Sequence, residues 1–405
     1  MKTSSQESGG WLQRFAVLVA VCTWGLVCMG GLVTSKGVGM AVPDWPTSYG
    51  YNMFALPVST WLTGGVFDEH THRLWASTVG LFVVALTRWL GGYASRKALL
   101  AVGVAEILAG FGLLALGPDW KGGGHFLAGI GGVVLLAGVV WFRNGPSAAP
   151  LPTLGWLAFW AVQLQGLLGG LRVVLDKHVF SGTTLGTAFG VFHGCLGQAF
   201  LVLLCVIALR LSGFWRRLPL AGAPVTGFRW LLPVATGLVF LQLLLGALMR
   251  HQHAGLAIHD FPLAYDQFWP ATDAQSLLGY NQNRSEEIEV TAFQIQLQMF
   301  HRLGGLLASV AVLAVWVLAV RTGGFQSLWG RMTSAWAALV VVQVLLGIFT
   351  ILRNKPADVA TAHVAVGALT LVTGCLLVVV SRRQERSVPV PAGARDVSAL
   401  APATP

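Results

Sequence analysis

The segments Glu69-His70-Thr71-His72-Arg73-Leu74 and Gln298-Met299-Phe300-His301-Arg302-Leu303 occur in one chain, and each opens a long apolar run. Each segment has a counterpart further along the chain in a histidine inside another apolar run, His193 in the first half and His363 in the second. The two halves therefore repeat one arrangement, in which two histidines lie in two separate apolar runs.

The loops that precede these segments also match. Gly39-Met40-Ala41-Val42-Pro43-Asp44-Trp45-Pro46 corresponds to Gly255-Leu256-Ala257-Ile258-His259-Asp260-Phe261-Pro262, 216 positions later. The histidine segments lie 229 positions apart, but Gln165–Gly169 and its match Gln343–Gly347 lie only 178 apart. This decrease of 51 positions indicates extra residues in the first half. We expect them to form a helical hairpin, 98–142, inserted into one of two pseudo-symmetric four-helix bundles.

The composition indicates a membrane protein. Of 405 residues, 55% are hydrophobic and 10% are charged, whereas soluble domains have about 25% charged residues. The net charge of +10 does not indicate nucleic-acid binding, because the basic residues lie mostly in short loops on one side. Apolar runs long enough to cross a bilayer predict an all-α polytopic membrane protein with about ten transmembrane helices, at 15–34, 70–90, 98–117, 124–142, 153–175, 185–211, 229–249, 297–320, 329–352 and 358–381.

The distribution of Lys and Arg predicts the orientation, because cytoplasmic loops are enriched in these residues. Most of them lie inside if both termini are cytoplasmic, and the long loops 35–69 and 250–296 are then extracytoplasmic. The start of the chain lacks the Arg-rich pattern of an organellar transit peptide, which favours a bacterial plasma membrane. The predicted divisions are a cytoplasmic N-terminus (1–14), an N-terminal bundle including the hairpin (15–211), a cytoplasmic linker (212–228), a C-terminal bundle (229–381) and a disordered cytoplasmic tail (382–405).

Histidines inside membrane spans are costly and usually functional. We expect His72 and His301 at the starts of their helices, and His193 and His363 five to eight residues into theirs, so that all four lie at similar depth. Two opposed imidazoles on facing helices are the ligands of a bis-histidine haem, which predicts the pairs His72 with His193 and His301 with His363. A single histidine would more simply be explained by hydrogen-bonded packing. No CxxC or CxxCH motif occurs, which argues against covalently attached haem.

The residues beside these histidines differ in what they can do. Arg73 and Arg302 follow the histidines and are candidates for contacts with haem propionates, or else for interfacial anchors. Glu69 precedes His72 by three residues and so shares its helix face, whereas the matching residue of the second half is Gln298. One half thus carries an acid/base group that the other lacks, unless Glu69 is merely solvated at the interface.

Two further groups of residues have no assigned role in this scheme. His251, His253 and His259 have spacing that resembles a metal site, but no Cys lies nearby in the sequence. Glu106 is an unusual carboxylate within an apolar run of the predicted hairpin.

The Glu-x-x-His-Arg motif of Glu69, His72 and Arg73, the repeated Gly-x-Ala-x-x-Asp-aromatic-Pro loop and the later histidines resemble the heme A synthase family. The resemblance covers about 15–381 except the hairpin. It implies two four-helix bundles, of which the C-terminal one holds haem b through the iron ligands His301 and His363. The N-terminal bundle would take heme O between His72 and His193, and Glu69 would act in oxidising its C8 methyl group to a formyl group by successive hydroxylations.

This chain departs from the family in two ways. It has ten predicted spans rather than eight, and loop 35–69 lacks the cysteine pair of some members. The resemblance also implies a heme O synthase (a farnesyltransferase) as upstream partner, while the electron acceptor stays unidentified. Two alternatives are a diheme cytochrome b that carries electrons and a haem transporter or chaperone. The difference between Glu69 and Gln298 favours an enzyme, because an electron carrier does not need it.

Overall fold

A computed structural model describes residues 4–140, 151–180, 183–218, 226–282 and 289–385. Within these ranges, nine helices are long and apolar enough to cross a membrane. The predicted all-α polytopic membrane fold is confirmed. Of the predicted tail, 382–405, the first four residues are helical, and 386–405 lie outside the described residues, as does part of the linker, 219–225. The long helices are α1 (Ser4–Ser35), α3 (Gly64–Ala115), α4 (Lys121–Val139), α5 (Leu151–Val174), α6 (Leu185–Leu211), α8 (Thr226–His251), α10 (Ala292–Gly323), α11 (Leu328–Leu352) and α12 (Ala357–Glu385).

Short elements connect the long helices. A two-residue antiparallel pair, β1 with β2, precedes α6. Side-chain caps fix where three long helices begin: Thr184 accepts from the Thr187 N–H at α6, Ser327 from the Gly330 N–H at α11, and Thr291 forms a capping box with Gln294 at α10. The short elements are η1 (Met53–Ala55), α2 (Val58–Trp61), η2 (Pro118–Trp120), β1 (Val179–Phe180), β2 (Thr183–Thr184), α7 (Gly213–Arg217), η3 (Ala254–Leu256) and α9 (Ala274–Gln282).

Helix α3 explains why ten apolar runs give nine helices. It contains the predicted span 70–90 and all but the last two residues of 98–117, and it bends at Gly92, whose φ of 53° and ψ of −134° are non-helical. A side chain disfavours this conformation, so glycine permits the bend. The Arg88 guanidinium donates to the Gly92 carbonyl at 2.7 Å and so satisfies one backbone group there. The expected break between the two spans is therefore a kink within one helix rather than a loop.

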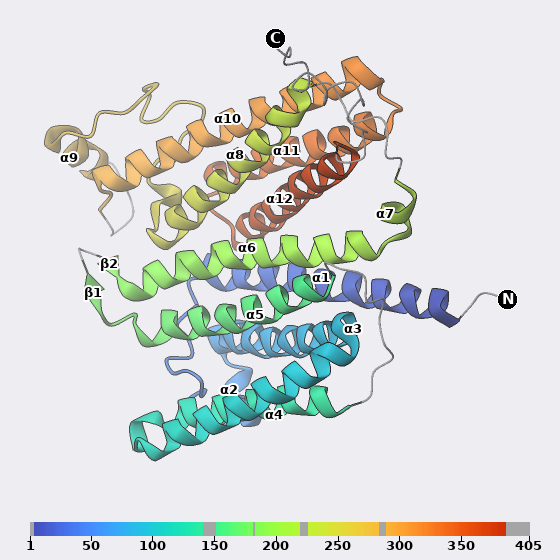
Figure 1. The fold of residues 1–405 in the computed structure, drawn as a ribbon. Coiled ribbons are helices and arrows are strands. Elements are labelled where there is room, and N and C mark those ends of the chain that lie inside the picture. The colour runs from blue at the N-terminus through green and yellow to red at the C-terminus, as the bar shows by residue number, and fades with distance from the viewer. Residues whose placement is uncertain (1–3, 141–150, 181–182, 219–225, 283–288, 386–405) are drawn as a thin grey trace, which may run out of the picture.

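The long helices form two closed rings of contacts. Helices α1, α3, α5 and α6 contact one another in sequence around one ring, and α8, α10, α11 and α12 do so around the other. Helix α4 packs on α3, at the edge of the first ring. In Figure 1 the second ring, yellow to red, lies above the first, blue to green, and α4 lies at the bottom. The rings meet where α1 and α6 contact α12 and where α6 contacts α8.

Each ring has an apolar core, and apolar side chains also cover its outside. Leu86, Leu90 and Leu204 are among the fully buried residues of the first ring, and Phe228 and Trp336 of the second. Large apolar residues that are exposed include Leu108, Leu157, Val310 and Val341. In water such a surface would favour aggregation, so it indicates contact with lipid.

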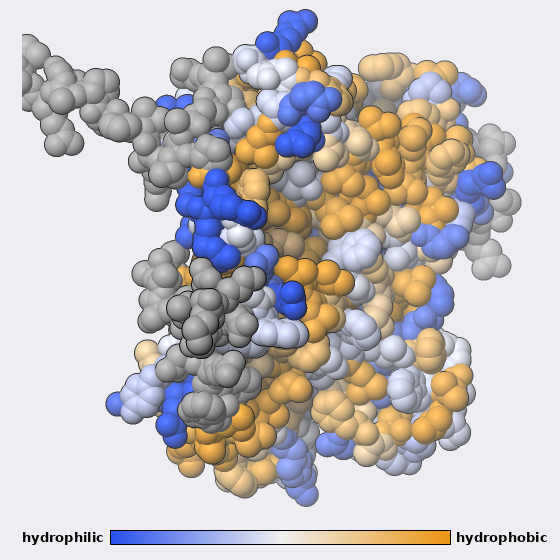
Figure 2. Space-filling model, turned by 90° about the vertical axis from the view of Figure 1, so that its right-hand side faces the viewer, coloured by the Kyte–Doolittle hydropathy of each residue, from blue (hydrophilic) through white to orange (hydrophobic). Residues whose placement is uncertain are grey.

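Helix α12 is the most enclosed span, because it contacts helices of both rings. Helix α1 begins and α12 ends at the same end of the bundle, on the right of Figure 1. Figure 2 views this end and shows hydrophilic and hydrophobic residues side by side on it.

Candidate functional site

One large cavity runs through both rings. Its volume is about 1610 Å³, and its walls include His72, His193, His301 and His363 together with many apolar residues. Pockets for a single drug-sized ligand are about 300–1,000 Å³. The cavity is therefore large enough for more than one such ligand, and all four predicted histidines line it.

The four histidines lie at similar positions in their helices. His72 is eight residues after the start of α3, His301 nine after the start of α10, His193 eight after the start of α6 and His363 six after the start of α12. At 1.5 Å per residue these offsets correspond to about 9–14 Å. The expectation that His72 and His301 begin their helices was wrong.

Helix α3 starts before its apolar run because its first polar side chains are paired. Asp68 forms an ion pair with Lys36 at 2.9 Å. His70 lies 3.3 Å from the Ser48 hydroxyl and packs edge-on against the Trp61 ring. These contacts pair the polar residues at the start of α3. A prediction from apolar residues alone places them outside the helix.

Each histidine ring packs against a glycine of a neighbouring helix. A Cβ placed on any of these four glycines would lie 3.1 Å from the Cε1 atom of the histidine, which is closer than most real Cβ contacts. Glycine thus leaves the ring the space it occupies. The pairs are Gly30 with His72, Gly169 with His193, Gly246 with His301 and Gly347 with His363.

Two glycines that the sequence placed beside the histidines have another neighbour. Gly197 and Gly367 lie four residues after His193 and His363 and line the cavity. A Cβ on Gly197 would lie 3.1 Å from Gln165 Nε2, and one on Gly367 3.0 Å from Gln343 Nε2. These glycines therefore leave room for glutamine amides, and the glycines that touch the rings come from the adjacent helices.

The predicted histidine pairs lie close together. His72 interacts electrostatically with His193, and His301 with His363. His193 Nδ1 lies 3.1 Å from the Gln165 carbonyl oxygen, which leaves Nε2 available as a ligand. This is the arrangement in which a backbone carbonyl orients a metal-binding imidazole.

The remaining ring nitrogens also fit ligation of iron. The Nδ1 atoms of His72 and His363 are buried and have no hydrogen-bond partner. The Gln242 amide nitrogen lies 3.0 Å from Nδ1 and 3.2 Å from Nε2 of His301. The Gln343 amide nitrogen lies 3.4 Å from Nε2 of His363. Two pairs of imidazoles in an apolar cavity, with an unsatisfied ring nitrogen on His72 and on His363, fit two bis-histidine haems.

Glu69 is buried, with 4% of its surface exposed, so it is not a solvated interfacial residue. Its Oε2 accepts a hydrogen bond from the Val42 N–H at 2.8 Å, and its Oε1 accepts from Arg73 Nη2 at 2.7 Å. Glu69 also lines the cavity. The carboxylate is therefore held in the wall beside His72 by one loop N–H group and one guanidinium.

Gln298 takes the matching place in the second ring. The Ile258 N–H donates to Gln298 Oε1 at 2.7 Å, and Gln298 Nε2 donates to the Ile258 carbonyl at 3.1 Å. In the first ring the Val42 carbonyl instead accepts from Arg73 at 2.8 Å. The two loops are held by corresponding contacts, but only the first has an ionisable group at this position.

Arg73 and Arg302 hold the loops that precede their helices. Arg73 donates to the carbonyls of Asp44 and Thr47 at 2.7 and 3.2 Å. Arg302 donates to the carbonyls of Asp260 and Leu263 at 2.7 and 2.9 Å. Contact of either guanidinium with propionates stays a prediction, and the structure gives both a role in positioning the loops.

Asp44 organises the turn of the first loop. Burial raises the pKa of its carboxyl group, but hydrogen bonds from the Thr47 hydroxyl and from the N–H groups of Gly50 and Tyr49, with the charge of Arg73, outweigh burial and lower the pKa overall. In the second loop Asp260 likewise accepts from the Tyr265 N–H, at 3.0 Å.

Sequence reasoning missed some lining residues and overrated others. Arg250 and His251 line the cavity, although the sequence offered only the histidine spacing as a signal. No group of three or more potential metal ligands occurs in the part of the chain that the structure describes, so His251, His253 and His259 do not form such a cluster. Glu106 accepts a hydrogen bond from the cavity-lining Gln163 at 2.7 Å, a contact that only tertiary structure reveals.

Comparison with known proteins identifies relatives. The model of a family described as cytochrome oxidase assembly protein matches residues 124–375. The heme A synthase of Jannaschia sp. (strain CCS1) is 31% identical over 267 residues, which cover 63% of this chain and 65% of that protein. The heme A synthase of Hyphomonas neptunium is 25% identical over 375 residues (90% of this chain and 92% of that protein), and that of Rhizorhabdus wittichii is 26% identical over 374 (89% and 91%). With more than half of its length matched by the family model and these relatives beside it, the chain belongs to the heme A synthase family of cytochrome oxidase assembly proteins.

Proposed function

We propose that this protein is a bacterial membrane oxidoreductase of heme A biosynthesis, which oxidises the C8 methyl group of heme O to a formyl group by successive hydroxylations. The observation that carries the proposal is the difference between the histidine pairs. Buried Glu69 lies in the cavity wall beside the pair His72 and His193, whereas Gln298 takes its place beside the other pair. The relatives named heme A synthase support the proposal.

The two histidine pairs hold different haems in this proposal. His301 and His363 hold haem b, the resident iron cofactor, and His72 and His193 hold the substrate heme O. Bound haem b supplies the redox chemistry of the reaction. The cavity that both pairs line is mostly apolar, and in an apolar medium charged groups interact more strongly.

Glu69 acts on protons in this proposal. Conversion of a methyl to a formyl group replaces two hydrogens with one oxygen atom and passes four electrons to an external acceptor. The protons released call for a group near the reacting carbon that accepts protons and stabilises positive charge. The carboxylate of Glu69 is held by the Val42 N–H and by Arg73, so it does not need to be reoriented. Gln298 cannot ionise, which supports the N-terminal ring as the place of the chemistry in this proposal.

Pigment analysis tests the proposal. The chain is expressed together with a heme O-producing farnesyltransferase, its expected upstream partner, and haems are extracted from cells and from purified protein. Heme A formation that depends on this chain is the expected result. Haem b alone in both rings would favour an electron carrier, and bound heme O without heme A would favour a transporter or chaperone. Cells with the farnesyltransferase alone are the control.

A further inference from the structure

The guanidinium of Arg172 forms no hydrogen bond or ion pair within the described parts of the chain. Arg172 lies near the end of α5 and lines the cavity. The ion pairs within 4.0 Å among described residues are Lys36 with Asp68 and Arg73 with Glu69. A positive charge in an apolar membrane cavity is costly unless an anion accompanies it.

Two carboxylates lie near Arg172, but neither forms an ion pair with it within 4.0 Å. Glu69 and Asp176 interact with it electrostatically. Glu69 is bonded to Arg73, however, and Asp176 accepts from the Thr184 hydroxyl at 3.2 Å. The guanidinium is also closely packed: a Cβ on Gly39 would lie 2.4 Å from Arg172 Nη2. The first loop thus leaves space for this guanidinium only because position 39 is glycine.

Arg250, at the end of α8, extends this positive region between the rings. Arg250 lines the cavity and donates through Nη2 to the Gly31 carbonyl at 2.7 Å and to the Ser35 hydroxyl at 3.0 Å. Both acceptors are neutral, so these bonds leave its charge uncompensated. Arg172 and Arg250 are also close enough to repel each other electrostatically.

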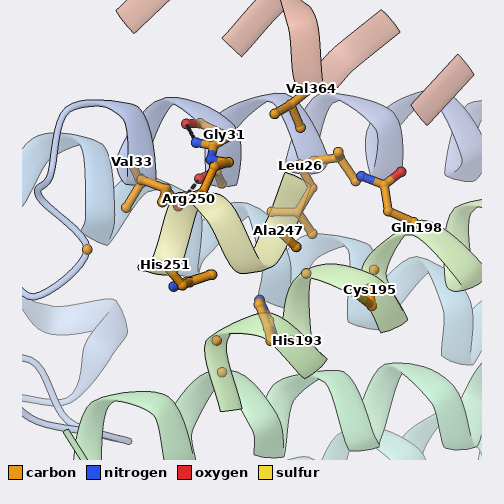
Figure 3. Close-up of a pocket in the computed structure, with 18 of the residues that line it drawn as sticks. Leu26, Gly31, Val33, His193, Cys195, Gln198, Ala247, Arg250, His251 and Val364 are labelled. Atoms are coloured by element: carbon orange, nitrogen blue, oxygen red, sulfur yellow. Dashed lines mark hydrogen bonds between the residues drawn. The ribbon is translucent and has the colours of Figure 1, made fainter. Parts of the chain in front are cut away.

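His251 brings the region next to the histidine pair of the first ring. Figure 3 shows His251 and His193 projecting into the space between α8 and α6, while Arg250 is bonded to α1. His251 interacts electrostatically with both Arg172 and His193. A Cβ on Gly190 would lie 2.6 Å from His251 Cε1, so the ring is packed against α6.

We propose that Arg172, backed by Arg250 and His251, is a carboxylate-binding site for the tetrapyrrole held between His72 and His193. The inference rests on the proposed function and deepens it. A ligand of this site needs an apolar body that fits the cavity and an anionic group that pairs with the guanidinium groups. A haem meets both requirements, because its macrocycle is apolar and its propionates are anionic. A guanidinium pairs with a carboxylate through two parallel hydrogen bonds.

Arg172 is better placed for this role than Arg73. Both terminal nitrogens of Arg73 are already bonded to loop carbonyls or to Glu69. Arg172 interacts electrostatically with His72 and with His193, so its charge lies near both imidazoles of this pair. In the second ring, Lys355 lies against Gly255, the counterpart of Gly39, at 3.6 Å from a Cβ placed there. An ammonium does not reproduce the planar fork of Arg172.

Titration with haem b and with its dimethyl ester, in which both carboxylates are blocked, tests the inference. Purified full-length protein is titrated in detergent, and the binding phase that His193→Ala abolishes is assigned to the first ring. The variants are Arg172→Leu, Arg172→Lys and, as control, Arg353→Leu, which removes an exposed arginine outside the cavity.

Wild type and Arg353→Leu should bind haem b at least about tenfold more tightly than the ester in this phase, since a hydrogen bond to a charged group is typically worth that much. Arg172→Leu should lose this preference with unchanged ester affinity, and Arg172→Lys should keep part of it. An equal preference in wild type and Arg172→Leu would overturn the inference. So would loss of bound phospholipid phosphate from Arg172→Leu with unchanged haem affinity, because the site would then hold a lipid headgroup. Absence of any phase that depends on His193 would instead contradict the proposed function.

Discussion

The Val42 N–H donates a hydrogen bond to Glu69 Oε2 across a separation of 27 residues, at 2.8 Å. The matching bond of the second ring joins the Ile258 N–H to Gln298 Oε1 at 2.7 Å. The same backbone position thus meets a carboxylate in one ring and an amide in the other. Gln298 shows that an amide is compatible with such a loop. Replacing Glu69 by Gln therefore removes the ionisable group and keeps the acceptor for the loop N–H.

Glu69→Gln should leave haem binding largely intact and lower conversion of heme O to heme A by about 10²–10⁴-fold, the usual contribution of an acid/base group. Gln keeps an acceptor for the Val42 N–H but cannot ionise. The measurement is the ratio of heme A to heme O in cells at matched protein levels. Asp68→Asn is the control, since it removes a neighbouring carboxylate whose ion pair with Lys36 is partly exposed. Wild-type heme A yield with Gln at position 69 would contradict a catalytic role.

His301→Ala and His363→Ala should each weaken retention of haem b, because a six-coordinate iron then loses one axial ligand. The imidazoles of His301 and His363 interact electrostatically within the second ring of helices, and both line the cavity. Absorption spectra of the purified variants should show loss of the bis-histidine signature. His72→Ala is the comparison, since it should leave the haem b spectrum of the second bundle in place. An unchanged spectrum in both His301→Ala and His363→Ala would refute the assignment.

Gly246→Ala should lower haem b retention several-fold, because its Cβ would lie 3.1 Å from His301 Cε1 and the ring must move. Gly237→Ala on the same helix is the matched control, since nothing lies within 4 Å of a Cβ there. Alanine also favours a helix over glycine by about 1 kcal/mol, so the control should be neutral or stabilising. Haem content per protein after gel filtration measures both. Equal retention would show that this contact does not position the ligand.

Most of the fold followed from the sequence, because apolar runs of membrane length leave few alternatives to helices. The bend at Gly92 did not, since glycine is common in this chain and only the observed φ distinguishes this one. The histidine pairs were predictable because the repeat marks the same position twice. Their glycine partners lie on other helices, so matched positions such as Gly30 and Gly246 were visible but their contacts were not.

The contacts of Glu69 and Arg73 required the tertiary structure. Residue spacing placed Glu69 on the same helix face as His72, yet the loop groups that hold it come from far along the chain. Arg73 shows the same limit: its position after a histidine suggested a propionate contact, and its observed acceptors are loop carbonyls and the Glu69 carboxylate. A local pattern identifies a side chain's chemistry, whereas its partner depends on how the loop folds back.

The first loop should lose stability in acid through Asp44. Its folded pKa is lowered, so the carboxylate contributes stability that is fully present above its unfolded pKa of about 3.9 and is lost as pH falls through the folded value. Protease sensitivity of the loop should therefore rise at low pH in wild type. Asp44→Asn should raise sensitivity at neutral pH and reduce its dependence on pH. A wild-type pH profile in Asp44→Asn would assign the effect to another group.

The second part of α3 and helix α4 should both cross the membrane, with Lys121 outside and Arg96 inside. Lys121 is exposed at the start of α4. Arg96 follows the bend at Gly92 and donates to the Gly138 carbonyl at 3.2 Å, so it lies at the opposite end of α4. A helix of 19 residues spans about 28 Å at 1.5 Å per residue, close to the hydrocarbon thickness of a bilayer.

Labelling of introduced cysteines with a membrane-impermeant maleimide tests this topology. Lys121→Cys should react in intact cells, whereas Arg96→Cys should react only after the membrane is opened. The parent chain is the control, because its five cysteines are all at least partly buried and set the background. Reaction at position 121 only from the cytoplasmic side would mean that the hairpin does not cross. Equivalent helices of the two rings keep the same direction only if the first half has an even number of added spans. Those spans would then have to lie elsewhere in the chain.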